Sequence, residues 1–184
     1  MALEEVTITL HILSAAVAVG AVITTDFLHL KGLKNHSLEK KLLGVYPYLT
    51  QIIYLTLAAL LITGLGVLHF RPWLLQGSFF QLKMALFTLV IINGVVLNHR
   101  VGKLLETVVK TGNASKRYLI ESSLFGSLSV VTWISIFVLA LTKDTGGYSI
   151  QQFLTAYTCL LALVFIISYF AQATSHSTAH QKKQ

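Results

Sequence analysis

The chain has 184 residues, of which 54% are hydrophobic and only 11% are charged, and its formal net charge is +7 at neutral pH. A soluble domain carries about 25% charged residues, so this composition excludes an ordinary water-soluble globular fold. The alternative solvent is lipid, in which apolar outer faces need no polar covering. A nucleic-acid-binding surface would need basic residues interleaved with aromatic ones on a soluble face, and we expect no nucleic-acid partner.

Five apolar segments are each long enough to cross a membrane, for which a helix needs about 20 predominantly apolar residues. They comprise residues 7–28, 48–69, 79–97, 123–142 and 150–171. Because backbone polar groups in lipid must be bonded within their own segment, the predicted fold is all-α. We expect a single transmembrane domain over residues 1–184, built as a polytopic bundle of five transmembrane helices.

Several local signals refine this prediction. Pro72 is expected to stop the second helix, and Pro47 suits its first turn. In the fourth segment Ser122 and Gly126, and likewise Ser123 and Ser127, are four residues apart. Such small residues let neighbouring helices approach closely, and a flat cofactor lying against the helix would use the same room.

The basic residues predict the orientation. The first and third connections and the C-terminal tail carry most of the lysines and arginines. By the positive-inside rule these segments face the cytoplasm, which puts the N-terminus outside and the C-terminus inside. We therefore expect an integral protein of a bacterial cytoplasmic (inner) membrane, with lipid headgroups as partners of the inner loops.

Ionisable residues inside a membrane are expensive and indicate function. His11 lies one to two turns below the outer surface, and His29 follows 18 residues later on the same helical face. At 1.5 Å per residue the two imidazoles are about 27 Å apart, too far to serve one metal centre. Asp26 lies near the inner boundary, where pairing with Lys31 or Arg100, proton relay and simple interfacial solvation are all open.

The predicted topology places His69 level with His11 and His99 level with His29. Neutral imidazole is the usual axial ligand of a b-type haem held between helices. His11, His69, His29 and His99 are therefore candidate ligands of haem iron, and an interfacial position without a role is the alternative for the last three. Lys83 either reaches the outer surface or turns inward toward a propionate or another anionic group.

The order of these features resembles a known superfamily over residues 10–142. His11 is followed nine residues later by Gly20, and "WLLQGSFFQLKMALFTLVIINGVVLNHRVGKLLE" supplies a short outer turn, Lys83, an apolar helix and a basic exit. The stretch "RYLIESSLFGSLSVVTWISIFVLAL" then gives a fourth helix led by a glutamate. This arrangement resembles the superfamily of HemJ-type protoporphyrinogen oxidases and the membrane part of CopD-type copper-resistance proteins.

The resemblance implies a haem b cofactor, held by His11 and Lys83, with Lys83 also needed for activity. It further implies a HemJ-like oxidoreductase that removes hydrogens from protoporphyrinogen, with a quinone or another membrane redox partner. Where the family has an arginine at the end of the first helix, this chain has Asp26 nearby.

Three functions follow from these residues. The leading one is an integral membrane redox protein that binds b-type haem, with protoporphyrinogen oxidation as its specific version. The first alternative is a CopD-like copper or small-solute transporter or accessory protein, in which His11, Asp26 and Lys83 line a polar path. The second alternative is a structural membrane subunit whose polar residues only join helices, and a homo-oligomer is compatible with all three.

Overall fold

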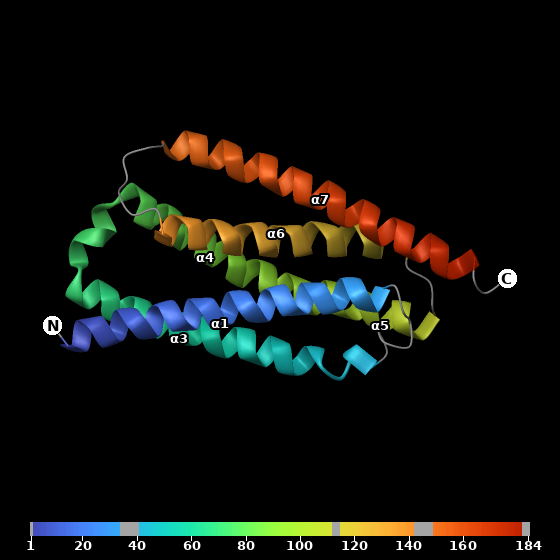
Figure 1. Cartoon of the computed structure of the whole chain (residues 1–184), viewed down its shortest axis with the longest axis horizontal. Helices are drawn as coiled ribbons and strands as arrows, with labels where there is room; N and C mark the ends of the chain where they lie inside the picture. The colour runs from blue at the N-terminus through green and yellow to red at the C-terminus, as the bar shows by residue number, and fades with distance from the viewer. Residues whose placement is uncertain (1, 34–40, 112–114, 142–148, 182–184) are drawn as a thin grey trace.

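The computed structural model describes residues 2–33, 41–111, 115–141 and 149–181, and this part of the chain is helical with no strand. Figure 1 shows the order of the elements. They are α1 (Ala2–Leu33), α3 (Tyr46–Phe70), a 3-10 turn (Pro72–Gln76), α4 (Ser78–Val96), a π-turn (Leu97–Val101), α5 (Gly102–Thr111), α6 (Lys116–Leu141) and α7 (Ile150–Gln181). Within these described residues, five helical segments are long and apolar enough to cross a membrane, which confirms the predicted all-α class and the five predicted helices.

The helices extend beyond the predicted apolar segments. The first begins at Ala2 and ends at Leu33, whereas residues 7–28 were the predicted span. The third predicted segment, residues 79–97, corresponds to α4 and does not end at Leu97. No proline interrupts the chain there, so the helix passes through the π-turn into α5. Apolar composition marks only the part of a helix that lies in hydrocarbon, so it gives the spans but not the helix ends.

The prolines act as predicted. Pro47 occupies the first turn of α3, where its missing N–H costs no helical hydrogen bond. The helix ends at Phe70, and Arg71 leaves the helical conformation (φ −132°, ψ 63°) directly before Pro72. A residue before proline disfavours the helical region, which explains why the helix stops here and the chain turns toward α4.

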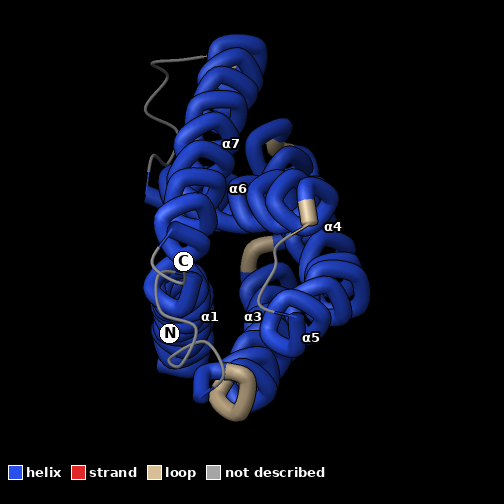
Figure 2. Tube along the Cα trace, turned by 90° about the vertical axis from the view of Figure 1, so that its right-hand side faces the viewer, coloured by secondary structure: helices blue, strands red, loops and turns tan. Residues whose placement is uncertain are grey.

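The bundle consists of a pair of helices and a group of three helices, which meet at a shared core. The helices α1 and α3 lie side by side, and α6 packs between α4 and α7 (Figures 1 and 2). One cluster of buried side chains joins α1, α3, α4 and α6; it consists of Ala18, Val22, Leu57, Leu60, Val90 and Trp133. We call it the central apolar cluster. By contrast α7 lies outermost, and its most apolar stretch contains no buried residue.

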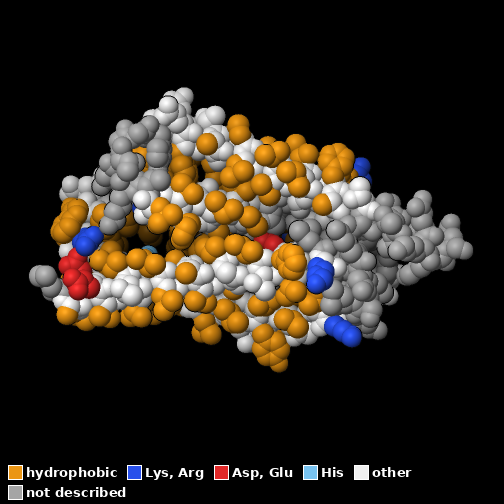
Figure 3. All heavy atoms as spheres, in the orientation of Figure 1, with side chains coloured by type: hydrophobic (Ala, Val, Ile, Leu, Met, Phe, Trp, Pro, Cys, Tyr) orange, Lys and Arg blue, Asp and Glu red, His pale blue; other side chains and the backbone are white. Residues whose placement is uncertain are grey.

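The surface is that of a protein in lipid. Figure 3 shows apolar side chains along the length of the bundle, whereas the acidic and basic ones gather mainly toward its two ends. Large apolar side chains are widely exposed, as for Leu55 (70%) and Ile62 (69%). A soluble monomer rarely exposes continuous apolar area of this extent. These are the features of an integral membrane protein.

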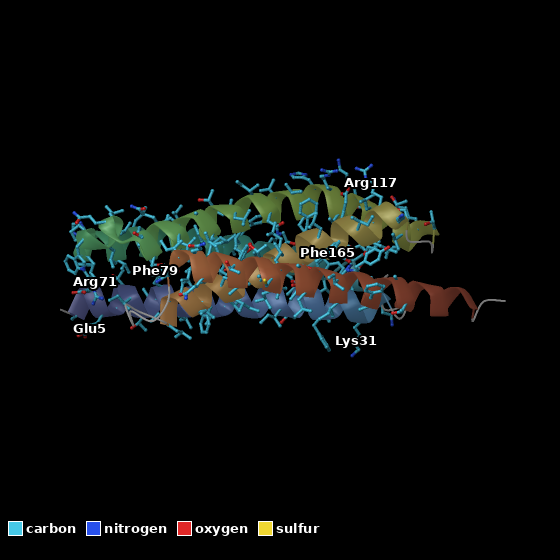
Figure 4. All side chains as sticks on the ribbon, turned by 90° about the horizontal axis from the view of Figure 1, so that it is seen from above. Glu5, Lys31, Arg71, Phe79, Arg117 and Phe165 are labelled. Atoms are coloured by element: carbon cyan, nitrogen blue, oxygen red, sulfur yellow. The ribbon has the colours of Figure 1, made fainter. Side chains whose placement is uncertain are left out.

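The two ends of the bundle differ in charge. Figure 4 shows Glu5 and Arg71 at one end, and Lys31 and Arg117 at the other. We call the first the Arg71 end. The second, which also carries Arg100 and the lysines of α5, we call the basic end. Which end faces the cytoplasm remains the prediction made from the distribution of lysine and arginine.

Candidate functional site

The pairing of α1 with α3 positions His11. The two helices run antiparallel, and at the Arg71 end the Arg71 Nε donates to Glu4 Oε1 at 2.8 Å. Farther along, Gly66 faces Thr7 so closely that a Cβ on Gly66 would lie 2.8 Å from Thr7 Cγ2. One helical turn farther along α1, His11 is in direct contact with α3 and is half-buried.

The His11 ring is held by Thr63. Its Nδ1 lies 2.9 Å from Thr63 Oγ1, and that hydroxyl lies 2.7 Å from the Ala59 carbonyl oxygen. A carbonyl only accepts, so a Thr63 hydroxyl that donates its proton to Ala59 can receive an N–H from His11 Nδ1. We assign this tautomer, in which the lone pair is on Nε2, because it satisfies both contacts. That nitrogen is the one that would bind a metal ion, and a hydrogen bond on the other nitrogen is the usual support of a ligating histidine.

Gly64 allows this approach. A Cβ on Gly64 would lie 3.4 Å from His11 Cε1 and 3.8 Å from its Nδ1, at the lower limit of ordinary van der Waals contact. The imidazole therefore packs against α3 at Gly64, where a larger side chain would meet the ring. The spacing of Thr63 and Gly64 was not recognised in the sequence, because a threonine–glycine pair in an apolar helix has no distinctive pattern.

His69 is not brought beside His11. His69 comes six residues after Thr63, which is about 9 Å farther along α3 toward the Arg71 end. Its side chain is exposed, and its ring contacts Phe70 at a centroid distance of 5.3 Å. His69 was predicted to lie level with His11, but it lies more than one helical turn farther toward the Arg71 end. The direct contact of α1 with α3 also leaves no gap between them for a macrocycle.

Lys83 lies in the second turn of α4 and is half-buried. Its helix begins just after the 3-10 turn that follows Arg71, so Lys83 is at the same end of the bundle as His11. The two residues to which the family resemblance assigns haem binding therefore share the half of the bundle near the Arg71 end.

At the basic end, His29 contacts α6. Its Nε2 lies 3.1 Å from the Tyr118 hydroxyl oxygen, and the rings of Tyr118 and Tyr46 lie 6.1 and 6.5 Å from the imidazole, centroid to centroid. Because the nitrogen that would bind iron is hydrogen-bonded to a phenol, His29 is a poor candidate for a ligand. His99 is exposed in the π-turn.

Asp26 is buried at one carboxylate oxygen. Within the described part of the chain, its Oδ2 has no hydrogen-bond partner. Arg100 bonds Glu121 Oε1 at 3.1 Å instead, and the Lys31 ammonium lies 6.0 Å from the Phe27 ring centroid. Pairing of Asp26 with Lys31 or Arg100, one of the predicted alternatives, is therefore absent among the described residues.

Other buried polar residues lie in the half of the bundle near the basic end, which also contains Asp26. The Ser122 hydroxyl lies 2.7 Å from Gln172 Oε1, and Gln172 Nε2 donates to Ser168 Oγ at 3.2 Å. Asn93 Nδ2 donates to the Phe125 carbonyl at 3.0 Å and joins α4 to α6. Sequence reasoning missed Gln172, which is 2% exposed and could have been noticed as a lone amide among apolar residues.

The serines of the predicted small-residue pairs are buried in the packing of α6, whereas Gly126 is not closely packed, since a Cβ there would meet nothing within 4 Å. Ser122, Ser123 and Ser127 are all buried, between 0% and 7% exposed. The Ser127 hydroxyl donates to the Ser123 carbonyl one turn before it, at 2.6 Å. This local bond satisfies the hydroxyl without requiring a partner on another helix, so neighbouring helices can pack directly on this face.

An apolar region separates the two polar parts of α1. His11 and Asp26 are about 22 Å apart along the helix, and Ala15, Ala18 and Val22 lie between them in or against the central apolar cluster. The described residues thus form no continuous polar path along this face. Nor do three or more histidine, cysteine, aspartate or glutamate side chains come together among them to hold a metal ion.

Comparison with known proteins gives no relative from which a role could be transferred. No protein-family model, no curated protein and no solved structure matches the chain. The resemblance to the HemJ- and CopD-type superfamily therefore remains a prediction made from the residues quoted above.

Proposed function

We propose that this integral membrane protein binds b-type haem through His11 and takes part in membrane electron transfer. The observation that carries the proposal is the 2.9 Å contact of His11 Nδ1 with Thr63 Oγ1. In the tautomer assigned above, the ligating lone pair is on Nε2. A histidine buried in a membrane without a function would be an unexplained cost. One oriented imidazole meets the requirement of haem for an axial ligand.

The positioning of the imidazole supports this proposal. The ring packs against α3 at Gly64, and its hydrogen bond with Thr63 holds its rotation. A bound haem supplies one-electron chemistry, which the protein tunes through the ligand, its hydrogen bond and its burial. Because His69 lies about two turns away from the level of His11, we propose a single histidine ligand from this chain.

The specific version of the proposal is oxidation of protoporphyrinogen, with a quinone as the acceptor class. It draws its support from the family resemblance and from the position of Lys83 on α4, in the same half of the bundle as His11. An ammonium in this position suits a carboxylate of the haem or of a porphyrin substrate. In this version Lys83→Ala abolishes the activity and leaves His11 able to hold the haem.

The proposal is tested by the visible spectrum of the protein purified in mild detergent from a haem-replete host. We expect a Soret band in the wild type that is lost in His11→Ala. The matched control is His69→Ala, which changes an exposed histidine of the same half and should keep the band. A colourless wild-type preparation would overturn the proposal, and so would a band that survives in His11→Ala.

The two alternatives give different results. Transport through a polar path of His11, Asp26 and Lys83 would have to cross the central apolar cluster, whose Ala18 is 0% exposed. A structural subunit would lose stability in His11→Ala without any spectral or redox change. If the wild type is colourless and His11→Ala is colourless and less stable, the result favours the structural role.

A further inference from the structure

The carboxylate of Asp26 needs an explanation that haem binding at His11 does not give. One of its oxygens is buried and has no donor among the described residues. A buried, unpaired carboxylate costs several kcal/mol or more, and such groups take up a proton instead of staying charged. The position is about 22 Å along α1 from His11, so the two sites are chemically separate.

His29 connects this carboxylate to the end of the bundle. It follows Asp26 by three residues, a spacing that places two side chains on neighbouring parts of one helical face. Its Nε2 contacts the Tyr118 hydroxyl at 3.1 Å, and both residues lie at the basic end. Imidazole can accept a proton on one ring nitrogen while releasing one from the other, which makes it the usual proton shuttle.

The opposite direction is closed to protons. Val22 is one turn before Asp26 on α1 and is 6% exposed within the central apolar cluster. Trp133 and Leu57 fill the same cluster from α6 and α3. None of the side chains in this cluster is titratable. A proton on Asp26 therefore has its exit at the basic end.

Among the described residues, no basic side chain forms an ion pair with Asp26. On α6, Glu121 Oε1 binds both Arg117, at 2.8 Å, and Arg100 of the π-turn, at 3.1 Å. On α1 itself, Lys31 is exposed and lies over the Phe27 ring. The phenols of Tyr46, on α3, and Tyr118, on α6, lie against His29, and α7 contributes the neutral amide of Gln172, which bonds Ser122. The basic end also carries other titratable side chains, those of His99, Lys103, Glu106, Lys110 and Lys116.

We propose that Asp26 is a proton-binding site that exchanges with solution at the basic end through His29, which is partly exposed there and whose ring is held by the buried hydroxyl of Tyr118. In the resting state the carboxyl is protonated. Release passes its proton to one ring nitrogen of His29, directly or across one water, and the protonated imidazole then gives up a proton to the solution. Uptake is the reverse, so no electron donor or acceptor takes part.

The site is tested by infrared spectroscopy of the full-length protein in lipid. At neutral pH the wild type should show the C=O stretching band of a protonated carboxyl, and Asp26→Asn should remove it. Glu121→Gln is the matched control, because Glu121 is the carboxylate of α6 that is ion-paired at the same end. Absence of any band that depends on Asp26 would overturn the proposal.

The exchange route is tested in the same samples after transfer to heavy water. In His29→Phe the band should remain, and its deuterium shift should be slower by about tenfold or more, since exchange then needs local opening of the helices. His29→Gln should slow it similarly if the aromatic variant fails to fold, and His69→Phe should not. An unchanged exchange rate in both His29 variants would contradict the route. Haem content does not enter these readouts, so this test can fail or succeed independently of the proposed function.

Discussion

Gly66→Ala tests the α1–α3 contact on which the position of His11 depends. The added Cβ would lie 2.8 Å from Thr7 Cγ2, whereas ordinary contacts begin at 3.4 Å, so the helices must separate by several tenths of an ångström. Thr7 cannot turn its methyl group away without losing the bond from its hydroxyl to the Leu3 carbonyl, at 2.8 Å. Overpacking of this kind costs about 1–3 kcal/mol.

Helix propensity works in the opposite direction, since alanine is favoured over glycine by about 0.5–1 kcal/mol inside a helix. The matched control is Gly94→Ala in α4, where a Cβ would meet nothing within 4 Å. We expect Gly94→Ala to be neutral or stabilising. The difference in unfolding free energy between the two variants isolates the clash, at about 1–3 kcal/mol.

The assay is titration with a denaturing detergent, followed by circular dichroism. Thr7→Ser removes the methyl group and keeps the hydroxyl, so it should restore most of the loss when combined with Gly66→Ala. A double-mutant cycle then measures the coupling of the two positions. Equal stability of Gly66→Ala and Gly94→Ala, or a loss that Thr7→Ser does not relieve, would refute the proposed helix contact.

Three further predictions each change one side chain that forms hydrogen bonds between or along the helices. Thr63→Val should weaken haem binding about 10–100-fold in a haemin titration, while Thr63→Ser should not, because only valine removes the acceptor for His11; equal affinities would contradict the assigned tautomer. Gln172→Leu should lower the unfolding free energy by about 1 kcal/mol, the usual worth of an interhelical bond in a membrane, and no loss would mean that the amide is not engaged. Glu121→Gln should leave the unfolding transition almost unchanged, since its partners Arg100 and Arg117 are 54% and 66% exposed at their side chains; a loss larger than that of Gln172→Leu would show that the carboxylate is more deeply engaged.

The fold was largely predictable from the sequence, because lipid imposes a strong rule. Apolar length gave five spans, and Pro47 and Pro72 correctly marked the ends of α3. The continuation of α4 into α5 was not predicted, since Gly102 and the basic residues there resemble a loop. What makes that segment helical is tertiary: Leu105, Val108 and Val109 pack against Tyr118 in a second apolar cluster.

The candidate site was predictable only in part. His11 could be singled out because an imidazole at that depth is unusual. Its partner could not, since the register of two antiparallel helices depends on side-chain fit, and the close approach at Gly64 and Gly66 sets it. That register places Thr63 rather than His69 opposite His11. The unpaired state of Asp26 was likewise hidden, because the sequence does not reveal that Arg100 bonds Glu121 instead.

Rescue of His11→Gly by imidazole tests the central claim most directly. Glycine leaves a space beside Thr63 into which free imidazole can fit and supply the missing ligand. We predict that the purified variant lacks the Soret band of the wild type and regains it as imidazole is added, whereas His69→Gly keeps the band throughout. A wild-type band in His11→Gly before any imidazole is added would contradict the assignment of His11 as the haem ligand.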